Sequence, residues 1–242
     1  MSCLMGTPTT EFEPMNTRLT GICSMATRHI VADVADAWRR SGGEVAFESV
    51  GGVEAAKRVR DGEKFDIVVL AADAVDKLVA AGRIVAGSKT DLARSIVAIA
   101  VRTGAPRRDV GTEGALRETV LSARSIGYST GPSGVALQRL FERWGIAEAI
   151  RPRVVQAPPG VPVGTLITGG DVELGFQQLS ELMHLDGIDL IGPMPPGLEI
   201  DTTFSGGICT ATAQADAARA LLDFARSPAA DEAKRRHGMQ PA

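Results

Sequence analysis

The stretch Gly127–Gly145, "GYSTGPSGVALQRLFERWG", decides the fold class because a strand, a turn and a helix follow one another without a break. A short apolar strand leads into Thr-Gly-Pro-Ser-Gly, and an amphipathic helix begins at once. Gly131 and Gly134 remove side chains on both sides of Ser133, so the helix start presents backbone N–H groups and one hydroxyl. Such a start is typical of an α/β protein, and its partial positive charge suits an anion.

The same succession of strand and helix recurs along most of the chain. The apolar runs 19–24 and 65–72 predict buried strands, and the alternating run 44–50 predicts a half-buried one, each followed by a helical pattern. A second series starts after a link rich in glycine, proline and charge at 103–114. This alternation predicts parallel sheets covered by helices on both faces.

We therefore predict an α/β fold of two lobes, each a mixed, mainly parallel sheet flanked by helices. Two segments, near 93–102 and 201–212, are expected to cross between the lobes as hinges. The predicted boundaries are 16–95 plus 208–242 for the first lobe, 96–207 for the second, and 1–15 for a disordered leader.

Composition excludes several classes of protein. The net charge is −3, and the lysines and arginines are scattered, which argues against a nucleic-acid surface. No apolar run approaches the roughly 18–20 residues that span a membrane, so no membrane segment is expected. The first residues lack a basic head followed by an apolar stretch, so the product as encoded is expected in the cytoplasm.

Cysteine and metal-ligand patterns are sparse. Cys3, Cys23 and Cys209 are odd in number and widely spaced, which predicts reduced thiols. The sequence contains no HExxH motif, CxxC pair or carboxylate–histidine cluster at metal spacing. We therefore expect no metal site and no cofactor.

Other stretches resemble the Ser133 turn, because each places a small or amide residue between a predicted strand and a helix. Ser24 and Ser49 lie where predicted strands end, Gly160 precedes a helical stretch, and Gln177 begins a helix predicted over 177–184. Such turns are often simple helix caps. They also lie at the strand ends where ligands of open α/β sheets bind, so a shared anion pocket is the alternative. The candidate ligand-binding residues are Ser24, Met25, Ala26, Arg28, Ser49, Gly51, Gly52, Ser133, Gly134, Val161, Gln177 and Gln178.

Taken together, these segments resemble the type II periplasmic solute-binding fold, in its molybdate-binding-like branch. The resemblance extends from Leu19 to about Gly238. It implies a two-lobed protein that encloses a small anion, works in the periplasm and delivers its ligand to an ABC permease. The segments that carry it are "CSMATRHIVADVADAW", "GGVEAAKRVRDGEKFDIVVLAADAVDKLVAAGRI", "IGYSTGPSGVALQRLFERWGI", "PGVPVGTLITGGDVELGFQQ" and "ARALLDFARSPAADEAKRRHGM".

The resemblance also assigns ligand contacts. A second-loop serine of the family falls on Gly52, with Ser49 close by, and an aromatic hydroxyl of the fifth loop becomes Gln178. These departures add room and amide groups, which favours a flat di- or tricarboxylate over a tetrahedral oxyanion. The remaining contacts fall on Ser24, Ser133 and Val161.

Three functions are compatible with these residues. The first is a non-catalytic anion binder that closes its lobes, and the second is an isomerase of an unsaturated carboxylate, since the branch includes aconitate-isomerase-like proteins. The third is a regulator that lacks its own DNA-reading domain. An isomerase needs a base, for which His29 and Tyr128 are candidates, and Arg28 could pair with a carboxylate. His184 and His237 are expected at the surface.

Overall fold

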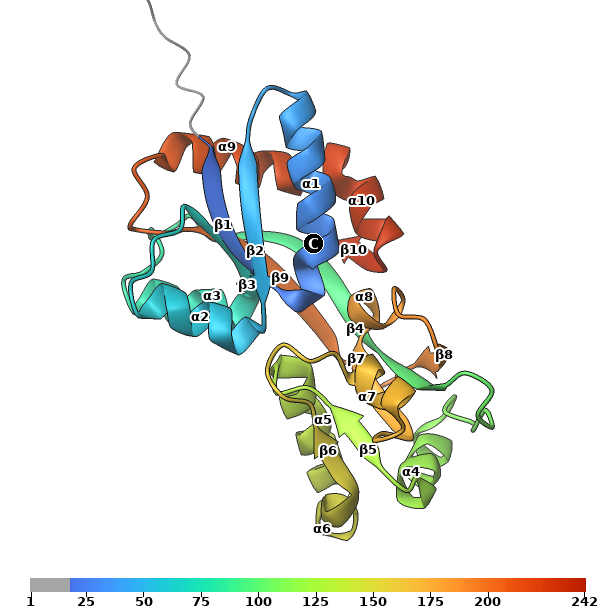
Figure 1. The fold of residues 1–242 in the computed structure, drawn as a ribbon. Coiled ribbons are helices and arrows are strands. Elements are labelled where there is room, and N and C mark those ends of the chain that lie inside the picture. Colours follow the sequence, from blue (N-terminus) through green and yellow to red (C-terminus); the bar gives the residue numbers. More distant parts are fainter. Residues whose placement is uncertain (1–17) are drawn as a thin grey trace, which may run out of the picture.

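The computed structural model describes residues 18–242, so the leader expected at 1–15 lies outside the described residues. The chain forms two lobes joined by two long strands (Figure 1). These strands are β4 (Thr90–Arg102) and β9 (Asp201–Ile208), which pair with each other in antiparallel fashion. None of the described helices is both long and apolar enough to cross a membrane.

The first lobe is built on three parallel strands in the order β2-β1-β3. Every residue of β3 is buried, because helices cover both faces of the sheet. Val69 belongs to the core on one face, while Val68 and Leu70 belong to the core on the other. The elements are β1 (Leu19–Ser24), η1 (Met25–Thr27), α1 (Arg28–Arg40), β2 (Val45–Val50), α2 (Gly52–Arg60), β3 (Ile67–Ala71) and α3 (Ala72–Ala80).

The second lobe repeats this plan with parallel strands in the order β7-β5-β6. Its two cores lie on the two faces of the sheet and consist mainly of valine, leucine, isoleucine and alanine. The elements are α4 (Glu113–Ser122), β5 (Ile126–Tyr128), α5 (Pro132–Arg143), α6 (Ala147–Ile150), η2 (Arg151–Arg153), β6 (Val154–Gln156), α7 (Val163–Gly169), β7 (Leu174–Gln178), α8 (Leu179–Leu182) and β8 (Ile188–Pro193).

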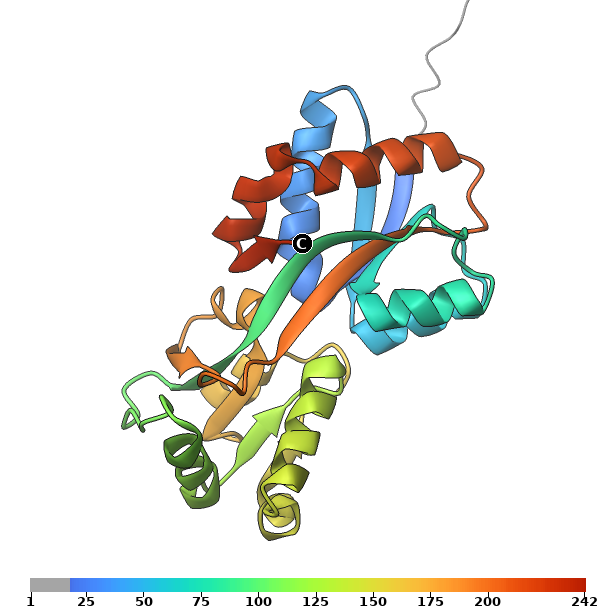
Figure 2. The ribbon, with the colours of Figure 1, turned by 180° about the vertical axis from the view of Figure 1, so that it is seen from behind.

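Strand β4 belongs to both sheets. Its first half pairs with β9 and β10, and its second half pairs with β7 and β8. Seen from behind, β4 and β9 run side by side from one lobe into the other (Figure 2). The C-terminal elements return to the first lobe, where Met239 pairs with Ser95 of β4. They are α9 (Ala215–Arg226), η3 (Pro228–Ala230), α10 (Asp231–Arg236) and β10 (Met239–Pro241).

The helix predicted over 177–184 is wrong at its start. Gln177 and Gln178 are the last residues of β7, where they pair with Ala98 and Val97 of β4. The helix α8 begins only at Leu179 and is four residues long. Backbone pairing with β4 therefore extends the strand through both glutamines, a tertiary contact that the local pattern does not contain.

Candidate functional site

The loops that follow the parallel strands of the two lobes face each other (Figure 1). A Cβ atom placed on Gly51, in the loop from β2 to α2, would lie 3.0 Å from the backbone nitrogen of Gly160 in the second lobe. A Cβ on Gly52 would lie 3.5 Å from the Cβ of Ser24. The loops at the ends of β1, β2 and β6 thus meet between the lobes.

In the first lobe, Ser24 is buried at the end of β1 and its hydroxyl lies 3.2 Å from that of Thr27. Met25 and Ala26 form the short helix η1 that follows. Ser49 points toward the neighbouring strand, with Oγ 3.1 Å from Sγ of Cys23. Ser24 directly precedes η1, which contacts α8 of the second lobe, whereas the Ser49 hydroxyl contacts a thiol of its own sheet.

The cysteines within the described residues are free and buried. Burial raises the pKa of the Cys23 thiol above its usual value and raises that of Cys209 to about 12. Both thiols are therefore protonated at neutral pH and poor nucleophiles.

In the second lobe, Ser133 and Gly134 are buried in the first turn of α5. Their N–H groups have no acceptor within the helix, as at any helix start. A Cβ on Gly134 would collide with the carbonyl oxygen of Ser129, so glycine is needed there for packing. The N–H of Val161 donates to the carbonyl of Pro158 at 3.0 Å, so this amide serves the turn.

The two glutamines at the end of β7 are held by hydrogen bonds. Oε1 of Gln177 accepts from the N–H of Val163, at 2.8 Å, and its Nε2 donates to Oε2 of Glu181, at 2.6 Å. Nε2 of Gln178 donates to the hydroxyl of Thr202, at 2.8 Å, and its buried Oε1 has no hydrogen-bond partner among the described residues. Gln177 therefore connects Val163 to Glu181 through its amide, and Gln178 keeps an Oε1 atom without a hydrogen-bond partner among the described residues.

Glu181 is a residue that the sequence reasoning missed. It lies in α8, which contacts η1 of the first lobe. Loss of hydration raises the pKa of its carboxyl to about 7, although the positive charge of Arg28 and the hydrogen bond from Gln177 both oppose the rise. A glutamate one turn beyond the end of a ligand strand was the available signal, but the loss of hydration at this partly buried side chain depends on its surroundings in the folded chain.

The two catalytic candidates from the sequence lie in different surroundings. His29 is in the first turn of α1, where its Nε2 accepts a hydrogen bond from Nε of Arg28 at 3.0 Å. Loss of hydration, followed by the charges of His184, Arg28 and His237, lowers the pKa of His29 to about 4.

Tyr128 is buried in the core of the second lobe, with its ring 6.3 Å from that of Phe141. Burial, and next the negative charge of Glu142, raise the pKa of the Tyr128 hydroxyl. His29 thus lies at the junction of the lobes, while Tyr128 packs within one of them.

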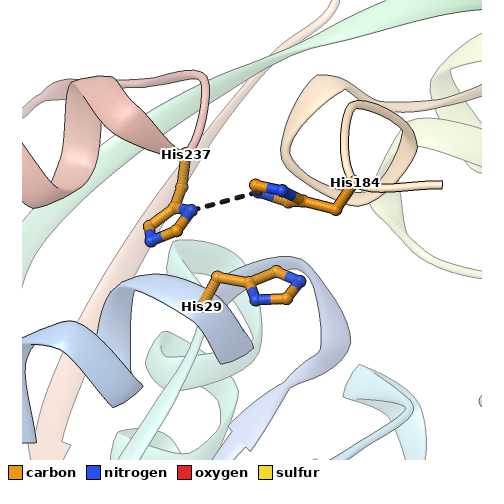
Figure 3. A group of neighbouring side chains, drawn as sticks. All are labelled: His29, His184 and His237. Atoms are coloured by element: carbon orange, nitrogen blue, oxygen red, sulfur yellow. Dashed lines mark hydrogen bonds between the residues drawn. The ribbon is translucent and has the colours of Figure 1, made fainter.

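The remaining two histidines join His29. His184 is exposed and His237 is partly buried, but they are not separate surface residues (Figure 3). Nδ1 of His237 lies 3.0 Å from Nε2 of His184, and the rings of His29 and His184 are 4.2 Å apart between centroids. Histidines from distant parts of the chain form one group, which no local spacing in the sequence could indicate.

Comparison with known proteins agrees with this architecture. Residues 19–240 match the family model described as bacterial extracellular solute-binding protein. Across 98% of its length the chain is 35% identical to an aconitate isomerase from a Pseudomonas species, of which it covers 93%.

Two solved structures share the fold at low sequence identity. The periplasmic molybdate-binding protein of Azotobacter vinelandii superposes with a TM-score of 0.75 at 16% identity, covering 91% of this chain and 98% of that one. The sulfate-binding protein SubI of Mycobacterium tuberculosis H37Rv gives 0.72 at 15% identity, covering 93% and 87%. Both confirm the predicted type II fold. With the family match over nearly all described residues, the chain belongs to the bacterial extracellular solute-binding proteins.

Proposed function

We propose that the protein binds a small unsaturated di- or tricarboxylate between its lobes and isomerises it by moving an allylic proton. The observation that carries the proposal is Glu181, a carboxyl group with a pKa of about 7 next to the loops predicted to hold the ligand. A general base works best when its pKa lies near the working pH. Glu181 takes this role in preference to the two candidates from the sequence.

The loops supply the means to hold carboxylates. The starts of α2 and α5 offer backbone N–H groups and the positive end of a helix dipole at Gly52 and Ser133. Arg28 adds a full positive charge, close enough to Glu181 to influence its pKa. Because Gly52 has no side chain beside Ser24, it does not restrict the ligand to the size of a tetrahedral oxyanion.

Gln178 can adapt to such a ligand. The Thr202 hydroxyl can donate as well as accept, so a half-turn of the Gln178 amide keeps their hydrogen bond. The turn would direct the NH₂ group to the place now taken by the unpaired Oε1. The buried amide could then donate to a carboxylate.

The chemistry conserves all atoms and electrons. The ionised Glu181 takes a proton from the carbon next to the double bond, and the electron pair of that C–H bond spreads over the adjacent double bond and carboxylate. The protonated Glu181 returns the proton to the far end of the allylic system, and the double bond moves by one position. Helix N-termini and Arg28 stabilise the charge that develops on the carboxylate between the two steps.

Sequence similarity supports the same reaction. The Pseudomonas relative is named for the isomerisation of aconitate, and the identity of 35% extends over 98% of this chain. The structural neighbours that bind molybdate and sulfate are too distant in sequence to indicate the ligand.

The second candidate is a binder without catalysis that hands its ligand to an ABC permease. The family description favours it, as do the starts of α2 and α5, which offer backbone N–H groups to an anion. We place the hinge in β4 and β9, between lobes bounded as the sequence predicts, and closure would bend both strands. Delivery to a permease requires export across the cytoplasmic membrane. Fractionation of cells that express the native gene tests the location.

One experiment separates binding from catalysis. Thermal shifts with molybdate, sulfate, phosphate, citrate and the two aconitate isomers identify the ligand, since a ligand at 100 times its dissociation constant adds about 2.7 kcal/mol. The protein is then incubated with trans-aconitate, and cis-aconitate is followed by proton NMR. We expect stabilisation by the tricarboxylates and turnover of trans-aconitate. Stabilisation without turnover would leave only the binder, and stabilisation by tetrahedral oxyanions alone would refute the carboxylate site.

A further inference from the structure

We propose that His29, His184 and His237 bind a divalent transition metal ion that links the two lobes. They are all the histidines in the 242-residue chain, and the structure brings them together from three distant parts of the sequence (Figure 3). One nitrogen of each lies within 4.8 Å of the others. The metal site is independent of the proposed isomerase activity.

The positions of the nitrogens suit one shared ion. In a tetrahedral zinc site with Zn–N bonds of about 2.0–2.1 Å, two ligand nitrogens are roughly 3.3 Å apart. Nδ1 of His237 and Nε2 of His184 are already 3.0 Å apart. The His29 ring lies against both others, with centroid distances of 4.2 and 5.3 Å, so small side-chain rotations would complete a three-nitrogen site.

Asp33 holds His237 in the required tautomer. Its Oδ2 lies 3.0 Å from Nε2 of His237, so this nitrogen carries the proton and Nδ1 keeps its lone pair. A carboxylate behind a ligating histidine is a frequent feature of metal sites, where it orients the ring and raises its basicity. Asp33 also accepts a hydrogen bond from Arg236 at 3.0 Å, which fixes the carboxylate.

The charge of the site permits metal binding. An imidazole binds a metal ion through the lone pair of one nitrogen and, when neutral, adds no charge to the site. Arg28, which donates to Nε2 of His29, and Arg236, which pairs with Asp33, are cations beside the site, and Asp33 supplies a negative charge there. Neutral imidazoles favour Zn²⁺, Cu²⁺, Ni²⁺ and Co²⁺ over Mg²⁺ or Ca²⁺.

The origin of the ligands gives the ion a mechanical role. His29 lies on α1 and His237 follows α10, both in the first lobe, whereas His184 follows α8 in the second. A metal bound by all three therefore favours the arrangement in which the lobes touch. Because His29 is adjacent to Arg28, the ion would bind beside the proposed substrate site without supplying any of its carboxylate contacts.

The test uses protein without a histidine tag, freed of metal with a chelator. Zn²⁺ is titrated by calorimetry, and Co²⁺ is followed by its visible d–d absorption, which is intense for four-coordinate ions. We expect one ion per chain and a rise in Tm of roughly 5–10 °C at 100 times the dissociation constant. Mg²⁺, added at the same concentration, should produce no shift.

Variants test the assignment of ligands. His184→Gln retains a polar side chain that can hydrogen-bond with His237 but removes the imidazole, and we expect metal affinity to fall at least 100-fold. Asp33→Asn, which keeps the shape but loses the charge behind His237, should weaken binding about 10–100-fold. Lys57→Gln, on the distant surface of α2, is the matched control and should bind as the wild type does.

Two results would overturn the proposal: no binding of Zn²⁺ or Co²⁺ at one ion per chain, or unchanged affinity in His184→Gln. Either would leave the histidines as a hydrogen-bonded contact between the lobes. Turnover of trans-aconitate by the metal-free protein bears on the proposed function alone, so the two proposals fail separately.

Discussion

The amide of Gln177 connects Glu181 to the start of α7. One end of it donates to the Glu181 carboxylate at 2.6 Å, and the other accepts from the N–H of Val163 at 2.8 Å. The Gln177 side chain is buried and both ends of its amide are hydrogen-bonded. The Glu181 carboxyl group is therefore fixed relative to the loop that meets Gly51 of the first lobe. A group with a pKa of about 7 is thus held where the lobes touch.

Replacing Glu181 with Gln should abolish isomerisation and preserve binding. General acid–base catalysis contributes about 10²–10⁴-fold, so we expect a loss in kcat of at least 100-fold with a dissociation constant within about threefold of wild type. In the wild type, kcat/KM should rise with pH through about 7, because the base must be ionised. Steady-state kinetics and calorimetry on the same samples measure both quantities. Full activity in the variant would assign the base to another residue.

The same substitution should change how stability depends on pH. Folding raises the pKa of Glu181 from 4.5 to about 7 and so favours its protonated form. The stabilising contribution of Glu181 to the free energy of unfolding is therefore complete below pH 4.5 and is lost as the pH rises through 7. Each pKa unit corresponds to about 1.36 kcal/mol. As the pH rises from 5 to 8, the free energy of unfolding of Glu181→Gln should therefore increase by about 2–3 kcal/mol relative to that of the wild type.

Urea unfolding of both proteins at the two pH values measures this difference and cancels the groups that they share. A difference that does not vary with pH would mean that Glu181 is hydrated and ionises normally. The base proposed for the reaction would then lose its physical support.

A methyl group on Gly51 should weaken ligand binding by separating the lobes. The backbone angles of Gly51, φ −57° and ψ 136°, suit alanine, so Gly51→Ala should fold normally. Its Cβ would lie 3.0 Å from the nitrogen of Gly160, and we expect affinity to fall about 10-fold through this contact, about 1.4 kcal/mol.

Gly114→Ala is the matched control for this change. Gly114 lies in α4, and a Cβ there meets no atom within 4 Å. We expect unchanged affinity and a gain in stability below about 0.5–1 kcal/mol, the gain for the middle of a helix, because Gly114 lies in the first turn. Equal affinity in both variants would show that the contact between Gly51 and Gly160 does not matter for binding.

Ser133 and its neighbour Gly134 should respond differently to alanine. Ser133→Ala removes one hydroxyl, and a hydrogen bond to a charged group contributes about 1.5–3 kcal/mol, so we expect affinity to fall roughly 10–100-fold with little change in Tm. Gly134→Ala forces a Cβ against the carbonyl of Ser129 and should reduce stability by about 1–3 kcal/mol. Calorimetry and thermal unfolding separate the two effects, and unchanged affinity in Ser133→Ala would remove this hydroxyl from the ligand site.

Much of the fold could be predicted from local patterns. The apolar run at Leu19–Ser24 coincides with β1, and the turn before Ser133 starts α5 as expected. These predictions succeed because a buried parallel strand must be apolar along its whole length, and because small residues at a helix start leave its N–H groups accessible. The candidate loops followed from the same rule, since parallel strands end at one edge of the sheet.

The sequence by itself determined the α/β fold and its two lobes, and it predicted ligand loops at the ends of the strands. Only the tertiary structure decided that pairing with β4 extends β7 through Gln178, that loss of hydration raises the pKa of Glu181 to about 7, and that His184 contacts His237. The physical reason is the distance along the chain over which each interaction acts. Hydrophobic periodicity and turn chemistry act within a few residues, whereas pKa values and side-chain clusters depend on groups brought together from distant parts of the chain.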